Sequence, residues 1–114
     1  MLENQQKLLI DSLKNLGLSY QEQEKIFPDF VDIMDEILSD FDNAFRLLPE
    51  IMDKKAISYN AVRSILYCHN LIELNLSITE RITDESFESG ECWQLVRNYA
   101  NESANCLNLE WGNI

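Results

Sequence analysis

Residues 59–82, YNAVRSILYCHNLIELNLSITERI, contain neither proline nor glycine and are apolar on two sides of a helical wheel. One side holds Val62, Ile65, Leu66, Ile72 and Leu76, and the other holds Tyr67, Leu71, Leu74 and Ile78. A helix that is apolar on two sides usually lies at the centre of a fold, with other elements around it. The pattern therefore predicts a core helix over Tyr59–Ile82, capped at its start by Ser58.

The chain before this helix begins with two predicted helices and a break. Leucines at positions 2, 9, 13 and 16 have near-helical spacing, and Gly17 follows where helices often end. The sequence SYQE at 19–22 is a capping box, in which the hydroxyl of Ser19 accepts from the backbone N–H of Glu22. We expect a helix over about residues 2–16 and a short helix after Ser19, which Pro28 interrupts.

A long acidic helix is predicted within FPDFVDIMDEILSDFDNAFRLL, residues 27–48. Its apolar face consists of Phe30, Met34, Ile37, Phe41, Ala44 and Leu48, widened by Leu38 and Phe45 and bordered by Ile33. Proline fits the first turn of a helix, so the helix is expected to start near Pro28. Pro49 ends it, because a residue before proline avoids the helical conformation. The following PEIMDKK is expected to add one further turn.

The last predicted helix covers about residues 91–108, with Trp93, Val96, Ala100 and Leu107 on one stripe. The polar segment before it, TDESFESGE, is expected to be a loop or a frayed helix start, and the tail NLEWGNI to dock through Trp111. No alternating strand pattern is present. Four main helices with short connections predict an all-α fold, a small antiparallel bundle of four to five helices in one domain over residues 1–114.

Charge and cysteine content restrict the possible functions. The chain has 20 acidic and 9 basic residues, a formal net charge of -11, which repels nucleic acids and anionic lipids and attracts basic proteins. Cys68, Cys92 and Cys106 form no C-x-x-C pair, which favours reduced thiols in a cytoplasmic protein. There is no secretory signal and no apolar run of membrane-spanning length, so no membrane association is expected.

Carboxylates are concentrated in two clusters that have few nearby bases. Acids three or four residues apart on a helix repel each other by about 0.2–0.5 kcal/mol per pair, so stability alone does not favour this pattern. In the long acidic helix, Asp29, Asp32, Glu36 and Asp40 are predicted to form a ridge opposite the apolar face, flanked by Asp35 and Asp42. We predict a partner-binding surface made of both clusters: Asp29, Asp32, Asp35, Glu36, Asp40, Asp42, Asp84, Glu85, Glu88 and Glu91.

The carboxylates and the single histidine do not have the pattern of a catalytic or metal-binding site. The segment DIMDEILSDFD lacks the glycine and the ligand spacing of an EF-hand, and a solvent-facing ridge does not perturb carboxyl pKa values as a cleft does. His69, the only histidine, falls on the apolar stripe of the core helix and is expected to be a core or boundary residue. We therefore expect no metal, no cofactor and no catalytic residue.

One short motif points elsewhere. In RSILYCH, Arg63 precedes His69 by six residues, which resembles the Arg-x(4–6)-His signature of the HEPN ribonucleases, an all-helical family with many RNA-cleaving toxins. The resemblance covers two residues of one helix, and Ser64 stands where many members have Asn. It implies RNA cleavage by Arg63 and His69. A net charge of -11 opposes that function because it repels the substrate.

The sequence thus favours a non-catalytic cytoplasmic protein that neutralises a basic partner, without direct binding to nucleic acid. Immunity proteins of bacteriocin and contact-dependent-inhibition systems are similar in character, since they are small, often acidic inhibitors of cationic nuclease toxins. The alternative is a helical adaptor or structural module whose acidity serves solubility. A HEPN-like ribonuclease is the third possibility.

Overall fold

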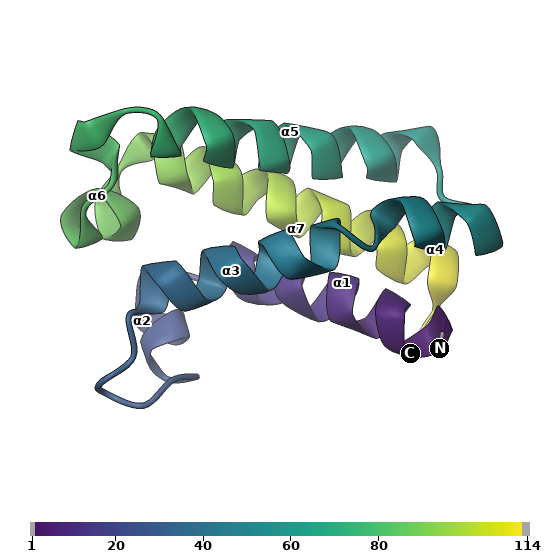
Figure 1. The fold of residues 1–114 in the computed structure, drawn as a ribbon, viewed down its shortest axis with the longest axis horizontal. Helices are drawn as coiled ribbons and strands as arrows, with labels where there is room; N and C mark the ends of the chain where they lie inside the picture. The colour runs from purple at the N-terminus through teal and green to yellow at the C-terminus, as the bar shows by residue number, and fades with distance from the viewer. Residues whose placement is uncertain (1, 113–114) are drawn as a thin grey trace.

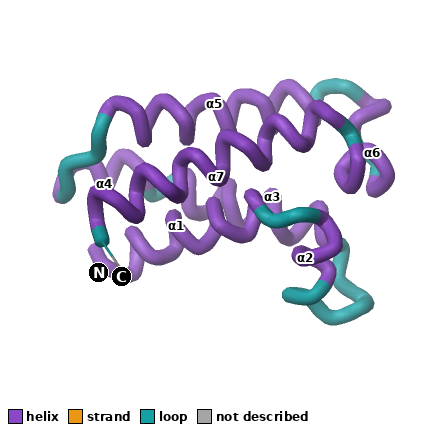
Figure 2. Tube along the Cα trace, turned by 180° about the vertical axis from the view of Figure 1, so that it is seen from behind, coloured by secondary structure: helices purple, strands orange, loops and turns teal. Residues whose placement is uncertain are grey.

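The computed structural model describes residues 2–112, and over that range the chain is helical with no strand (Figure 1, Figure 2). This confirms the predicted all-α class. The four long helices are α1 (Leu2–Gly17), α3 (Ile33–Phe45), α5 (Tyr59–Leu76) and α7 (Glu91–Trp111). The short ones are α2 (Tyr20–Glu24), α4 (Leu48–Lys54), α6 (Asp84–Ser89) and the 3₁₀ turn η1 (Thr79–Arg81).

The long helices run alternately up and down the long axis, as an antiparallel bundle requires (Figure 1). The main contacts between the long helices follow the order α5, α7, α1, α3: α5 packs on α7, α7 on α1, and α1 on α3. Helices α2 and α6 lie together at one end of the bundle, while α4 lies at the other end, beside the start of α1 and the end of α7 (Figure 1, Figure 2). Helices α3 and α5 are therefore at the two ends of this order of contacts, and they are called the outer helices below.

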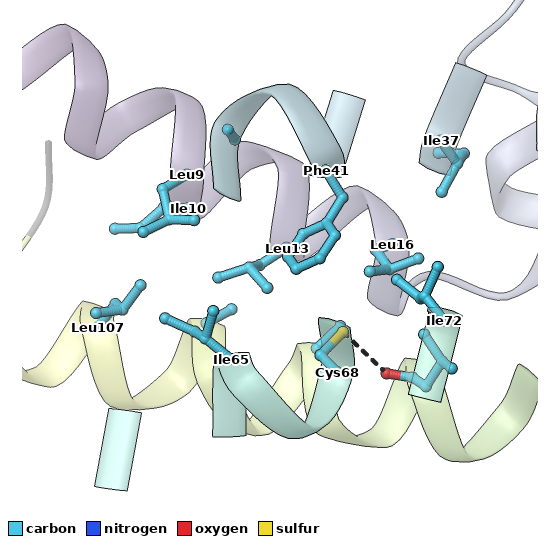
Figure 3. Close-up of a cluster of buried hydrophobic side chains, with 14 of the residues drawn as sticks. Leu9, Ile10, Leu13, Leu16, Ile37, Phe41, Ile65, Cys68, Ile72 and Leu107 are labelled. Atoms are coloured by element: carbon cyan, nitrogen blue, oxygen red, sulfur yellow. Dashed lines mark hydrogen bonds between the residues drawn. The ribbon is translucent and has the colours of Figure 1, made fainter. Parts of the chain in front are cut away.

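One cluster of buried apolar side chains joins the four long helices (Figure 3). Its centre contains Leu13 of α1, Phe41 of α3 and Ile65 of α5, each at most 1% exposed. Cys68 lies among them and donates through its Sγ to the carbonyl of Val96 on α7, at 3.7 Å (Figure 3). Burying each large apolar side chain contributes about 1.5–3 kcal/mol, so this cluster is the main source of stability.

The prediction that the acidic helix starts near Pro28 was wrong, because α3 begins at Ile33. The carbonyl of Pro28 instead accepts from the backbone N–H of Val31 in a turn. The carboxylate of Asp32 then caps α3 by accepting from the N–H of Asp35 at 3.1 Å. Phe30, predicted to lie on the apolar face, is 89% exposed in this turn.

The predicted acidic ridge is therefore shorter than expected. Asp29 lies in the turn before α3, and Asp32 is its cap rather than a residue of its helical face. Only Glu36 and Asp40 of the predicted ridge lie within the helix. A proline suits a turn as well as a first helical turn, and the aspartate cap at residue 32 decides between them.

The core helix was predicted to be longer than it is, because α5 ends at Leu76 and not at Ile82. The hydroxyl of Ser77 donates to the carbonyl of Leu74 at 2.6 Å, and η1 follows. Asn75 then donates to the carbonyl of Cys92 at 3.0 Å and accepts from Arg81 at 2.9 Å. These contacts with the start of α7 turn the chain back, and no local sequence signal encodes them.

The segment predicted as a loop or a frayed helix start contains α6, which Thr83 caps by accepting from the N–H of Ser86 at 3.0 Å. Phe87 of this helix is 1% exposed and lies edge-on to Trp93 and to Tyr20. The short helix is thus held by an aromatic cluster between α2 and α7. Its first residue is Asp84, so this packing also fixes the position of the second acidic cluster.

Gly17 at the end of α1 and Trp111 at the end of α7 were both singled out in the sequence, and both make contacts between helices. Gly17 is part of α1 with no positive φ, and its importance lies in packing, because a Cβ there would be 2.0 Å from Oδ1 of Asn101 on α7.

Trp111 docks as expected, although it belongs to a longer α7, and its Nε1 donates to the carbonyl of Ala56 at 3.4 Å. Glu110 beside it accepts from the backbone N–H of Ser58 at 2.8 Å, which ties α7 to the start of α5.

Candidate functional site

A groove of about 690 Å³ lies between α3 and α5 and extends to the start of α6. It exists because α3 packs on α1 and α5 packs on α7, so that side chains, rather than close backbone packing, connect the two outer helices. Near one end, the ring of Phe45 on α3 stacks on the imidazole of His69 on α5 with centroids 4.0 Å apart.

The floor of the groove is apolar. Its lining includes Met34, Leu38, Phe41, Ile72, Leu76 and Ile82. Phe41 and Ile72 belong to the buried core, whereas Leu76 is 38% and Ile82 is 47% exposed. The groove thus presents apolar surface to solvent directly above the core, and a partner that covered it would gain about 25 cal/mol for each Å² buried.

Carboxylates line the groove from both sides. They are Asp32, Asp35 and Asp42 from α3 and its cap, Glu73 from α5, and Asp84 from α6. Asp42 pairs with Arg46 at 3.0 Å, and Glu73 lies 3.8 Å from Nε2 of His69. Across residues 2–112, the other three carboxylates make no ion pair.

The groove is therefore electrostatically uneven along its length. Arg46 and His69 supply positive or ionisable groups near the Phe45 end, while Asp32, Asp35 and Asp84 have no ion-pair partner at the α6 end. A cation bound beside a low-dielectric apolar floor interacts with such carboxylates more strongly than one on open surface. This end of the groove is suited to a positively charged ligand that also has apolar groups.

The two acidic clusters of the sequence meet at the α2–α6 end of the bundle. Tyr20 shows this, because burial and then the negative charges of Asp84, Glu24, Glu88 and Asp32 raise the pKa of its hydroxyl. Gln21 also donates to Glu88 at 3.5 Å, which joins α2 to α6. The acids near Tyr20 come from segments that precede and follow the core helix in the sequence, so their proximity could not be predicted from the sequence.

The predicted partner-binding residues fall into two groups. Asp32, Asp35, Asp42 and Asp84 line the groove. The exposed residues Asp29, Glu36, Glu85, Glu88 and Glu91 lie outside it, and Asp40 lines a second hollow of about 440 Å³ between α1 and α3. The structure thus brings four of the ten residues together.

Sequence reasoning missed other groups in the groove. Glu73 was not singled out, although it lies one turn after His69 on the same helix. Leu76 and Ile82 were assigned to a continuous core helix, and the turn between them is what opens their side chains to the groove. Their contribution depends on the positions of separate helices, which single-helix periodicity does not encode.

The Arg63 and His69 of the short motif lie in different places. His69 is a boundary residue that lines the groove and stacks on Phe45. The guanidinium of Arg63 lies over the ring of Tyr67 at 4.7 Å and lines a separate hollow of about 230 Å³. The two side chains therefore contribute to different surfaces of α5.

A buried arginine holds the acidic end together. Arg97 of α7 is 3% exposed, and burial lowers the pKa of its guanidinium. Its Nε donates to the carbonyl of Leu18 at 3.1 Å and its Nη2 to the carbonyl of Phe87 at 2.7 Å. One side chain thus fixes the α1–α2 connection and α6 to α7, and with them the segment that begins with Asp84.

Metal-binding clusters and membrane-spanning helices are both absent from residues 2–112. No group of three or more His, Cys, Asp or Glu side chains in this range is arranged to hold a metal ion. No helix in it combines the length and the apolar character needed to span a membrane. Comparison with protein-family models, curated proteins and solved structures gave no match to this chain.

Proposed function

We propose that this chain is a non-catalytic acidic binding protein that neutralises a basic partner through the groove between α3 and α5. The partner class that fits best is a cationic nuclease toxin, which makes the chain an immunity or antitoxin-type inhibitor. The observation that carries the proposal is the combination of an apolar floor with three carboxylates that make no ion pair within residues 2–112, Asp32, Asp35 and Asp84.

The chemistry of nucleases supports this match. A nuclease binds phosphates with Lys and Arg, and these side chains are the natural counterparts of the groove carboxylates. Complementary charges accelerate association and select the partner, while a desolvated apolar centre limits dissociation. The groove offers both, and a partner whose phosphate-binding residues are engaged there has its active site or an adjacent surface covered.

The alternative is a helical adaptor or structural module whose acidity serves solubility. Carboxylates far from the groove favour it, such as the exposed Glu3, Asp53 and Glu102 on α1, α4 and α7. On that interpretation the groove carboxylates have no special role. If the groove is the binding surface, removing three groove carboxylates should weaken binding more than removing three carboxylates elsewhere. If acidity serves solubility alone, the two changes should have equal effects.

The experiment compares two variants that each lose three negative charges. The groove variant is Asp32→Asn, Asp35→Asn and Asp84→Asn, and the amide oxygen of asparagine retains the capping function at position 32. The distal control is Glu3→Gln, Asp53→Asn and Glu102→Gln. Each protein is used to capture partners from the source cell, and the captured nuclease is assayed with and without added chain.

We expect the native chain and the distal control to inhibit nuclease cleavage, and the groove variant to require much higher concentration. Equal inhibition by the native chain, the groove variant and the distal control would show that the partner binds to a surface other than the groove. A captured partner whose nuclease activity is unaffected by excess native chain would contradict inhibition itself.

A further inference from the structure

We propose that the groove receives one amphipathic helix of the basic partner, with an apolar face directed at the floor and Lys or Arg along both edges of that face. This rests on the proposed function in taking the partner to be basic. It goes further by naming the structural element recognised and its direction.

The walls of the groove favour a helix over an extended segment. Both walls are helices, α3 and α5, whose backbone groups are hydrogen-bonded within the helices. They offer no sheet edge, so an extended peptide would cover the apolar floor with unpaired backbone groups, at a cost in free energy. A helix satisfies its own backbone and binds by its apolar side chains, which is the helix-in-groove mode.

The length of the occupant follows from α3. This helix has 13 residues, and at a rise of 1.5 Å per residue it is about 20 Å long. The groove lining includes Asp32 at its cap and Arg46 just after its last residue, so the groove follows α3 from end to end. An occupant of about three to four helical turns matches this length.

The positions of the carboxylates set the charge pattern of the occupant. Asp32 and Asp35 belong to the α3 wall, whereas Glu73 and Asp84 belong to the opposite side. Cations on both edges of the apolar face therefore meet carboxylates, and cations on the outer face meet solvent. If the occupant carried cations along one edge alone, the carboxylates of one wall would have no positively charged partner.

The uneven charge along the groove sets the direction of the occupant. The N-terminus of a helix carries partial positive charge and its C-terminus partial negative charge. The carboxylates without an ion-pair partner are at the Asp84 end, and Arg46 is at the other. We therefore place the N-terminus of the occupant beside Asp32 and Asp84, so that it runs parallel to α3 and antiparallel to α5.

The test uses two synthetic peptides of 14 residues, blocked at both ends and composed only of Leu and Lys. In the first, Leu recurs at helical spacing; in the second, Leu and Lys alternate, which gives the strand period at nearly the same composition. Binding of each to the full native chain is measured by calorimetry at low and at high salt. We expect the helical peptide to bind at least about tenfold more tightly, a difference of 1.4 kcal/mol.

A groove-filling variant separates a seated helix from general charge attraction. Ser39 is exposed and lines the groove, so Ser39→Trp occupies space without removing a charge or a core side chain. The matched control is Asn105→Trp, at an exposed position of α7 outside the groove. We expect Ser39→Trp to weaken binding of the helical peptide about tenfold or more, and the control to leave it unchanged.

Direction is measured with a paramagnetic label on either end of the helical peptide. A label on the N-terminus should broaden the amide resonances near Asp84 and Ile82, and a label on the C-terminus those near Arg46 and His69. The reverse pattern would overturn the assigned direction. Equal binding of both peptides, or no effect of Ser39→Trp, would overturn the helix proposal.

These results are independent of the nuclease assay. If the groove variant loses nuclease inhibition while the helical peptide fails to bind, the proposed function stands and helix recognition is wrong. If the helical peptide binds as described and no captured partner has nuclease activity, helix recognition stands and the inhibitor function is wrong.

Discussion

Phe45 and His69 stack with their ring planes 7° apart and their centroids 4.0 Å apart, and so connect the two outer helices of the bundle. Phe45 ends α3, and His69 lies in the middle of α5. The pair lies beside the core at one end of the groove, with Phe41 one turn away at 5.8 Å from Phe45. The only histidine of the chain therefore has a structural partner that accounts for its position.

This pair leads to a stability prediction for His69→Ala. Aromatic pairs contribute about 0.5–1.5 kcal/mol beyond their buried area, so we expect a loss of about 1–2 kcal/mol in the free energy of unfolding. The measurement is urea denaturation. Glu73→Gln is the control, because Glu73 is largely exposed and its 3.8 Å contact with His69 is a surface interaction worth little. RNA cleavage lost specifically on His69→Ala would instead support the ribonuclease interpretation.

Arg97 gives the largest expected loss of stability at a polar residue. Its alanine variant leaves the carbonyls of Leu18 and Phe87 without their donor, and hydrogen bonds to charged groups contribute about 1.5–3 kcal/mol each. We expect Arg97→Ala to reduce the free energy of unfolding by about 3 kcal/mol or more, and Arg97→Lys by less because it keeps one donor. Amide hydrogen exchange in α6 should also accelerate in Arg97→Ala. Unchanged exchange there would show that α6 is held by its aromatic contacts alone.

Gly17 and Asn101 should behave as a coupled pair. Alanine favours a helix over glycine by about 1 kcal/mol, but a Cβ at position 17 would meet Oδ1 of Asn101 and displace its hydrogen bond to the Gly17 carbonyl. We therefore expect Gly17→Ala to stabilise the chain in an Asn101→Ala background and to give no gain in the native background. A double-mutant cycle from thermal melts measures this coupling. Additive effects would contradict the close approach of α1 and α7.

Stability should decrease at alkaline pH because the folded chain raises the pKa values of two thiols and a tyrosine. Burial raises the pKa of Cys68 from 9.0 to about 12, and the pKa values of Cys106 and Tyr20 are also raised. Above pH 9 the unfolded chain therefore ionises Cys68 while the folded chain does not, which favours unfolding. Between pH 9 and 12 this residue alone costs about 1.4 kcal/mol per pH unit.

The measurement is urea denaturation at a series of pH values from about 7 to about 11, which span the ionisation of an ordinary thiol. Cys68→Ala removes the buried thiol at some cost in packing, and its stability should decline less steeply above pH 9. An identical slope in the variant would assign the alkaline loss to Tyr20, Cys106 and other groups.

Much of the fold follows from local pattern. The start of α5 at Ser58, the Ser19 cap before α2 and the stripes of α1 and α7 are each encoded by neighbouring residues, and the structure confirms them. The errors are at helix ends where two local signals compete or a distant group decides. At α3, Pro28 competed with Asp32, and at the end of α5 the hydrogen bond from Asn75 to the carbonyl of Cys92 decided.

The candidate site was less predictable than the fold. Helical periodicity placed Asp32 on a solvent-facing ridge with Asp35 and Asp42 beside it, whereas all three residues line a groove. The groove depends on the spacing of α3 and α5, and Asp84 reaches it only because Phe87 and Arg97 fix α6. These relationships are tertiary, and no residue spacing within one helix encodes them.

The binding surface is tested most directly by comparing, on one partner, the charges inside the groove with the charges of the predicted ridge that lie outside it. The groove variant, Asp32→Asn with Asp35→Asn and Asp84→Asn, is set against Asp29→Asn, Glu36→Gln and Asp40→Asn, which removes three carboxylates that lie outside the groove. Binding kinetics with the captured nuclease are measured at low and physiological salt. We predict faster dissociation and a loss of about 2–5 kcal/mol for the groove variant, as for desolvated paired charges. For the ridge variant we predict only slower association at low salt. Equal losses in the two variants, or a larger loss from the ridge, would contradict the assignment of the binding surface to the groove.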